Sequence, residues 1–123
     1  MPSIQQAHQP ICSSLQVPEL GKFAFALSYR GESRDAILVR FKGVVYGYLN
    51  QCVHMPKPLD CEQAHIFDET GQYLQCSMHT ICYDPVTGES LSEICAGKKL
   101  TSFQVKEEGG WVYLADKRAV RLV

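Results

Sequence analysis

Two cysteine–histidine pairs are the residues of this sequence best suited to metal chemistry. Cys52 and His54 form a Cys-x-His motif, and Cys76 and His79 form a Cys-x-x-His motif later in the chain. Each pair comes where a predicted strand enters a loop, so one thiolate and one imidazole from each of two loop tips can meet at a common centre. Four ligands of this mixed type suit zinc or an iron–sulfur cluster.

Two other readings of these pairs are possible. The first is coincidence, since a lone cysteine or histidine is usually a packed residue. Two pairs at strand ends, separated by one loop, make coincidence a poor explanation. The second is a zinc site, but zinc sites with two cysteines and two histidines usually group them as a cysteine pair and a histidine pair. Here each loop supplies one of each.

Short strands must position these loops. Phe23 to Tyr29 alternates large apolar with small residues, which is the two-residue period of a half-buried strand. Ala36 to Phe41 and Val44 to Leu49 are rich in β-branched and aromatic residues, and Lys42-Gly43 between them predicts a hairpin. The sequence of residues 31–35 predicts a polar turn.

The second half of the chain predicts further strands. They cover Tyr73 to Cys76 and a hairpin of Thr101 to Lys106 with Trp111 to Ala115, around Gly109-Gly110. No window has a sustained helical period, and Asp60 to Phe67 is the best candidate for a helical turn. The long interruption over residues 50–72 is of a kind that is usually functional. We expect an all-β domain whose core includes the strand aromatics Phe23, Phe25, Tyr46, Tyr48, Phe103, Trp111 and Tyr113.

Composition limits the class of protein. The 123 residues suit one domain, 1–123, with tails over 1–10 and 117–123, although Val120, Leu122 and Val123 could extend a final strand. A net charge of −1 gives no basic excess for binding nucleic acid. The sequence shows no secretory signal and no stretch long enough to cross a membrane, so we expect a cytoplasmic protein with no membrane partner.

The motifs and their surroundings resemble the Rieske [2Fe–2S] family. Leu49 to His54 is similar to the entry to that family's first cluster loop, and Cys76 to Asp84 with Thr87-Gly88 is similar to its second loop. The resemblance covers about residues 15–115. It implies a fold of antiparallel sheets, with a small β-sandwich or barrel as base and a two-loop cluster-binding subdomain over about residues 50–88.

The resemblance also implies the cofactor and its ligands. One [2Fe–2S] cluster is expected, with Cys52 and Cys76 on one iron and His54 and His79 on the other. Two thiolates and two neutral imidazoles leave the oxidised cluster without net charge, so it accepts an electron more easily than an all-thiolate cluster. Rieske centres accordingly have potentials of about −150 to +300 mV.

Several positions depart from the pattern of the high-potential members. Lys57 and Met78 occupy the positions of the two cysteines that respiratory Rieske proteins join in a disulfide. Ile81 replaces a hydroxyl residue that hydrogen-bonds the cluster, whereas Tyr83 retains the position of a second such hydroxyl. Thr80 stands where the family usually has glycine. We therefore expect a soluble ferredoxin type with a potential in the lower half of the range.

The function implied is electron transfer between a reductase and an oxygenase or another oxidoreductase, by a carrier that is not itself catalytic. Outside the ligands only His8 and His65 remain, too few for the mononuclear iron of an oxygenase. The alternatives are a redox-sensing or regulatory iron–sulfur protein, a structural zinc module, and the small subunit of a nitrite reductase assembly. The remaining cysteines are expected to be ordinary thiols, with Cys61 and Cys82 the pair most open to redox reactivity: Cys12, Cys61, Cys82 and Cys95.

Overall fold

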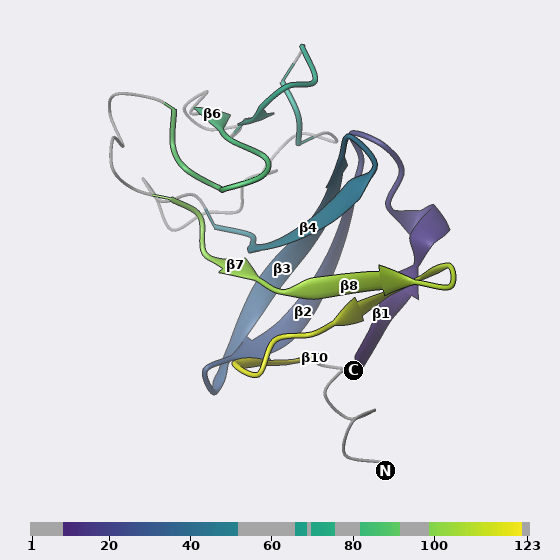
Figure 1. Cartoon of the computed structure of the whole chain (residues 1–123). Coiled ribbons are helices and arrows are strands. Elements are labelled where there is room, and N and C mark those ends of the chain that lie inside the picture. The colour runs from purple at the N-terminus through teal and green to yellow at the C-terminus, as the bar shows by residue number, and fades with distance from the viewer. Residues whose placement is uncertain (1–8, 52–65, 69, 76–81, 92–98, 122–123) are drawn as a thin grey trace.

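A computed structural model describes residues 9–51, 66–68, 70–75, 82–91 and 99–121 (Figure 1). Its strands are β1 (Gln9–Ser13), β2 (Lys22–Tyr29), β3 (Glu32–Phe41), β4 (Val44–Leu49), β5 (Leu74–Gln75), β6 (Cys82–Tyr83), β7 (Ser102–Phe103), β8 (Val105–Glu108), β9 (Trp111–Leu114) and β10 (Ala119–Arg121). Within those residues the only helix is the short 3-10 turn η1 (Ser14–Gln16). No helix there is long and apolar enough to cross a bilayer.

The strands form three antiparallel sheets, as the all-β prediction requires. The largest has the order β10-β2-β3-β4-β7, a second has the order β1-β9-β8, and β5 pairs with β6. Three hairpins turn through two residues that both have positive φ: Arg30-Gly31, Lys42-Gly43 and Gly109-Gly110. Such turns match the right-handed twist of the strands they join, which explains the glycine at the second position of each.

Some sequence-based boundaries are wrong. Residues 32–35, predicted to be part of a polar turn, extend β3 and pair with β2 from Ala26 to Tyr29. Gln9 and Pro10, assigned to a tail, belong to β1. Ala119 to Arg121 form β10, which agrees with the expectation that Val120 could belong to a final strand. Most of the predicted helical turn at 60–67 lies outside the described residues, and its last residue, Phe67, forms a β-bridge with Leu74.

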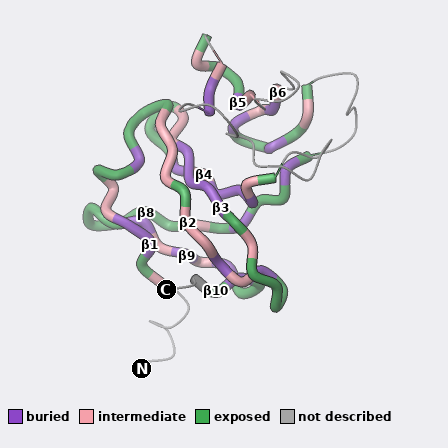
Figure 2. The backbone as a smooth tube through the Cα atoms, turned by 180° about the vertical axis from the view of Figure 1, so that it is seen from behind, coloured by how far each residue is buried: buried purple, intermediate pink, exposed green. Residues whose placement is uncertain are grey.

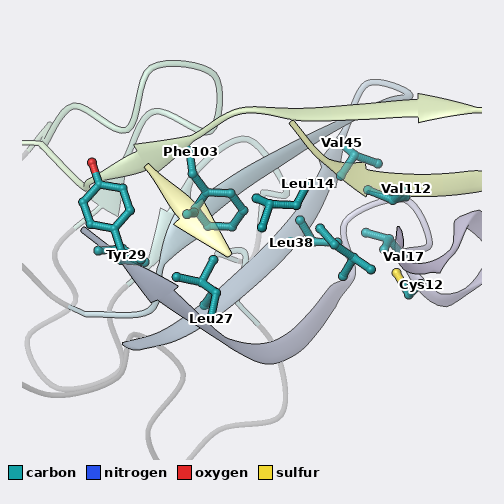
Figure 3. Packing of buried hydrophobic residues seen from close by; sticks show 13 residues of the cluster. Cys12, Val17, Leu27, Tyr29, Leu38, Val45, Phe103, Val112 and Leu114 are labelled. Carbon is teal, nitrogen blue, oxygen red and sulfur yellow. The ribbon is translucent and has the colours of Figure 1, made fainter. Parts of the chain in front are cut away.

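The first core fills the space between the two larger sheets (Figure 3). The inward residues of β2 are Phe23, Phe25, Leu27 and Tyr29, which confirms the predicted alternation. Ala36 and Leu38 of β3 lie beside them on the same face of the five-stranded sheet, and Val112 and Leu114 of β9 lie on the opposite sheet. Complete burial of one such aliphatic or aromatic side chain contributes about 1.5–3 kcal/mol. Because this core lies between two sheets that pack face to face, the base is a β-sandwich.

The second core lies on the other face of the five-stranded sheet. It joins Ile37 and Val39 of β3 and Tyr48 of β4 to buried residues from the shorter segments, namely Ile66, Phe67, Leu74, Tyr83 and Leu100. Figures 1 and 2 show β6 at one end of the molecule and β10 at the opposite end, with buried segments in both regions. The second core thus attaches the small β5–β6 sheet to the base.

Two aromatic residues of β9 differ from the prediction that they are part of the core, since Tyr113 is only half-buried and, like Trp111, belongs to neither core. Trp111 is 47% exposed, whereas its neighbours Val112 and Leu114 are buried. Trp111 pairs with Glu108 at the end of the β8–β9 hairpin. Because successive side chains of a strand point to opposite faces, Trp111 lies on the outer face when Val112 lies on the inner one.

Candidate metal centre

The four predicted ligands, Cys52, His54, Cys76 and His79, lie outside the described residues. The same holds for other residues that the sequence analysis named: His8, Lys57, Cys61, His65, Met78, Thr80, Ile81 and Cys95. The structure instead shows how the chain is held on either side of each loop. Among the residues that it describes, no three histidine, cysteine, aspartate or glutamate side chains come together as a metal site.

The first loop leaves from the end of β4. The backbone N–H of Leu49 donates to Thr101 O at 2.9 Å, and that of Asn50 donates to Asp35 O at 2.9 Å. The Arg34 guanidinium donates from Nη2 to Gln51 Oε1 at 2.6 Å. The chain is therefore tied to its neighbours up to the residue before Cys52.

The second loop connects β5 to β6. Gln75 pairs with Cys82, so the chain leaves the small sheet at residue 75 and returns beside it at residue 82. Further bridges join Phe67 to Leu74 and Tyr83 to Ser90, which extends the pairing on both sides. The two ends of the segment that contains Cys76 and His79 are therefore paired with each other.

Tyr48 links the strand that precedes the first loop to the turn that follows the second loop. Its side chain is 1% exposed, and its hydroxyl donates to Pro85 O at 2.7 Å, so β4 is bonded to the turn that follows β6. Burial, with a contribution from the Asp84 carboxylate, raises the pKa of the Tyr48 phenol. The hydroxyl therefore stays protonated and keeps its donor role.

The turn after β6 matches the predicted Asp and Thr-Gly pattern. Asp84 Oδ1 accepts from the backbone N–H of Val86 at 2.8 Å and of Thr87 at 3.3 Å, and Gly88 N–H donates to Asp84 O at 2.7 Å. Gly88 has φ +79°, and a Cβ there would lie 2.8 Å from the Tyr48 ring. Glycine is needed at this position both for its conformation and for the close approach.

Two of the remaining cysteines are described. Cys12 is buried in the first core. Cys82 is half-buried on β6, and burial, with a smaller effect from Asp68, raises the pKa of its thiol. Since the thiolate is the reactive form, a raised pKa lowers the fraction of this thiol that is reactive.

The sequence analysis missed two contributors to the site. It counted Tyr48 only as a core aromatic, although its hydroxyl joins β4 to the turn after β6. It placed Arg34 in a polar turn, although Arg34 lies in β3 and contacts the residue before Cys52. The partners of both lie at least 17 residues away, so no local pattern marks them.

Comparisons with solved structures identify the same fold. The ferredoxin of carbazole 1,9a-dioxygenase from Nocardioides aromaticivorans IC177 is similar over 89% of this chain and 98% of its own, with a TM-score of 0.70 and 22% identity. A chain from a complex of reduced oxygenase and oxidized ferredoxin of carbazole 1,9a-dioxygenase covers 91% of this chain and 96% of its own, with a TM-score of 0.69 and 19% identity.

The same fold also occurs within a longer chain. In the reduced complex between oxygenase and ferredoxin of carbazole 1,9a-dioxygenase, the match covers 89% of this chain and 28% of the other, at a TM-score of 0.70 and 19% identity. A search of curated protein sequences finds no match. The model of the Rieske [2Fe–2S] domain matches residues 7–104, a span that contains both Cys–His motifs. The chain therefore belongs to the Rieske [2Fe–2S] domain family.

Proposed function

We propose that this protein carries single electrons, as the ferredoxin component between a reductase and an oxygenase or another oxidoreductase. The observation that carries the proposal is the family match over residues 7–104, because it includes both Cys–His motifs and the strands that flank them. The family implies one [2Fe–2S] cluster, which supplies a site that takes up and releases one electron.

Cys52 and Cys76 bind one iron in this proposal, and His54 and His79 bind the other. The donor set fits the cluster, since thiolates and imidazoles in equal number are what a Rieske centre uses. The described structure supports the pairing of the two loops. One starts after β4, the other joins β5 to β6, and the second core packs these strands together.

The described residues hold the ends of both loops and provide a buried apolar core beside those ends. Tyr48, Leu74 and Tyr83 lie in the second core and are no more than 1% exposed. An apolar floor of this kind lowers the local dielectric constant and so tunes the potential of a nearby cluster. A histidine ligand, His54 or His79, would be the most direct exit for the electron, since these residues occupy loop tips in the family.

Redox proteins are the partners that fit this function. The similar structures include a ferredoxin and complexes of that ferredoxin with an oxygenase, which supports an oxygenase as the acceptor. The net charge of −1 agrees with a partner other than nucleic acid. We place the protein in the cytoplasm, where reduced thiols and reductases occur together.

Metal analysis and ligand variants test the proposal. The purified protein should be red-brown, contain two irons and two acid-labile sulfides, and give a rhombic EPR signal on reduction. Cys52→Ser and His79→Ala should abolish this signal. Cys82→Ser and His65→Ala are the matched controls and should retain it. Iron and colour that persist in both ligand variants, or bound zinc in place of iron, would show that the proposal is wrong.

Electron transfer itself needs a separate measurement. Stopped-flow mixing of the oxidised protein with a flavin- or nicotinamide-linked reductase should reduce the cluster rapidly, and the reduced protein should pass its electron to an oxygenase component. A protein that holds its cluster but exchanges electrons with neither component is a redox sensor and not a carrier.

A further inference from the structure

Arg34 lies at the end of β3 next to the start of the first ligand loop. It occupies the same face of the strand as Ala36 and Leu38, which belong to the first core. The regular pairing of β3 with β4 ends at Ala36 and Leu49. Arg34, which pairs with Leu27 of β2, is therefore two residues beyond the last position that pairs with β4, and it remains half-buried there.

Two contacts continue beyond that end. The backbone N–H of Asn50 donates to Asp35 O at 2.9 Å, and the Arg34 side chain donates to Gln51 Oε1 at 2.6 Å. Asp35 therefore holds Asn50 through its backbone carbonyl, and Arg34 holds Gln51 through its side chain. Gln51 is the residue directly before Cys52.

We propose that Arg34 is a positioning residue for the cluster: through Gln51 it fixes the backbone that leads into Cys52. The proposal rests on the proposed function, because it takes Cys52 as a ligand. A guanidinium suits this task, since its charge is permanent and its planar donors lose little freedom when they hydrogen-bond. Groups that orient metal ligands influence how tightly the metal is held even though they do not touch it.

Arg34 could act in two other ways, and both are testable. It could act only by its positive charge, which would favour the reduced cluster and would weaken with salt. It could also form an ordinary surface hydrogen bond with no effect on the loop. A positioning role differs from a charge effect and from a surface hydrogen bond without effect, because loss of Gln51 should then weaken cluster retention as much as loss of Arg34.

The experiment compares holo-protein variants at both ends of the contact. Arg34→Gln and Gln51→Leu should each speed cluster loss to an iron chelator by about 3–10-fold, somewhat less than the loss expected for direct partners of ligands. The double variant should be no faster than the single ones, because both remove the same contact. Arg34→Lys should restore part of the retention, and all three contact-breaking variants should show the same altered g values in the reduced EPR spectrum.

Arg30→Gln is the charge-matched control. Arg30 is exposed in the β2–β3 turn, so this variant removes one positive charge from the same hairpin and should behave as wild type. Equal cluster loss and EPR spectra in Arg34→Gln and Arg30→Gln would overturn the proposal. So would an unaffected Gln51→Leu, or rates that multiply in the double variant. If Arg34→Gln does not fold, Gln51→Leu decides the question. An error in the ligand assignment would show separately, as a cluster that persists in Cys52→Ser.

Discussion

At the scale of single residues, the hydroxyls of two buried tyrosines of the second core have different expected roles. Tyr48 donates to Pro85 O, whereas the resemblance assigns the Tyr83 hydroxyl to the cluster. A hydrogen bond to the cluster favours its more negative, reduced state. Tyr83→Phe should therefore lower the midpoint potential by on the order of 40 mV, the equivalent of about 1 kcal/mol for one electron.

Tyr48→Phe is the matched control for this prediction. It removes a buried hydroxyl from the same core but not from the cluster, so the protein should be less stable and its potential unchanged. Protein-film voltammetry measures the midpoint potential of both variants. The wild-type potential should lie in the lower half of the Rieske range, because Ile81 lacks the other hydroxyl. A wild-type midpoint above about +200 mV would contradict the assignment of these two positions.

Gly47 tests the packing of the first core at one position. A Cβ on this residue of β4 would lie 2.5 Å from Cε1 of Phe103, which is itself buried. Gly47→Ala should lower the free energy of unfolding by about 1–3 kcal/mol, as overpacking does. Urea denaturation measures the change. Adding Phe103→Leu should recover part of the lost stability if the ring is the cause, and full additivity of the two losses would show that it is not.

At the scale of elements, Asp116 joins segments that the sheet pairing leaves separate. Its carboxylate accepts from the backbone N–H of Gln104, between β7 and β8, at 3.0 Å, and from the backbone and side chain of Arg118, before β10. The hydrogen bond from the Arg118 side chain, supported by the backbone donors and opposed by burial, holds the pKa of Asp116 below its usual range.

A depressed pKa in the folded state makes the contribution of Asp116 depend on pH. Its stabilisation is present above the unfolded pKa of about 3.9 and is lost as pH falls toward the lower folded value. Asp116→Asn should cost about 1–3 kcal/mol at pH 7. The difference in unfolding free energy from wild type should shrink below about pH 4.

Denaturation of both proteins at several pH values checks this, because taking the difference cancels what the cluster contributes. Glu108→Gln is the control. Glu108 is 69% exposed in its ion pair with Lys106, so its loss should change stability by less than about 1 kcal/mol. A difference between wild type and Asp116→Asn that is independent of pH would show that the charge is not what stabilises the junction.

The elements also show where sequence reasoning succeeds. Strands β2, β3, β4 and β9 are predictable because alternation and turn glycines are local signals. The single strand predicted over Thr101 to Lys106 is wrong, since this segment forms β7 and β8, which belong to different sheets. The polar composition of residues 32–35 predicts a turn, but pairing with β2 overrides that preference. β1 was missed because its proline-containing sequence has no pattern of its own and depends on β9. The identity of the candidate ligands follows from local motifs, whereas the Arg34–Gln51 contact depends on residues brought together by the fold.

At the scale of the whole molecule, the two cores differ in the length of the strands that form them. The first lies between sheets built from strands such as the ten-residue β3, whereas the second depends on β5 and β6, which have two residues each. Both predicted ligand loops are connected to the second core. Binding of a metal centre stabilises the segments that supply its ligands, and weakly supported segments open before the rest of a protein does.

Removal of the cluster should therefore loosen the second core and leave the first intact. Hydrogen exchange, followed by mass spectrometry on protein before and after anaerobic chelation, measures the protection of each core separately. Peptides from β5, β6 and residues 84–91 should exchange at least about tenfold faster without the cluster, whereas those from β2, β3 and β9 should keep their protection. Equal loss of protection in both groups would mean that the base cannot fold without the cluster. Equal retention would mean that the described strands alone hold the loops in place. The predicted pattern, with only the β5–β6 region affected, requires the base to be a stable frame onto which the cluster secures the smaller sheet.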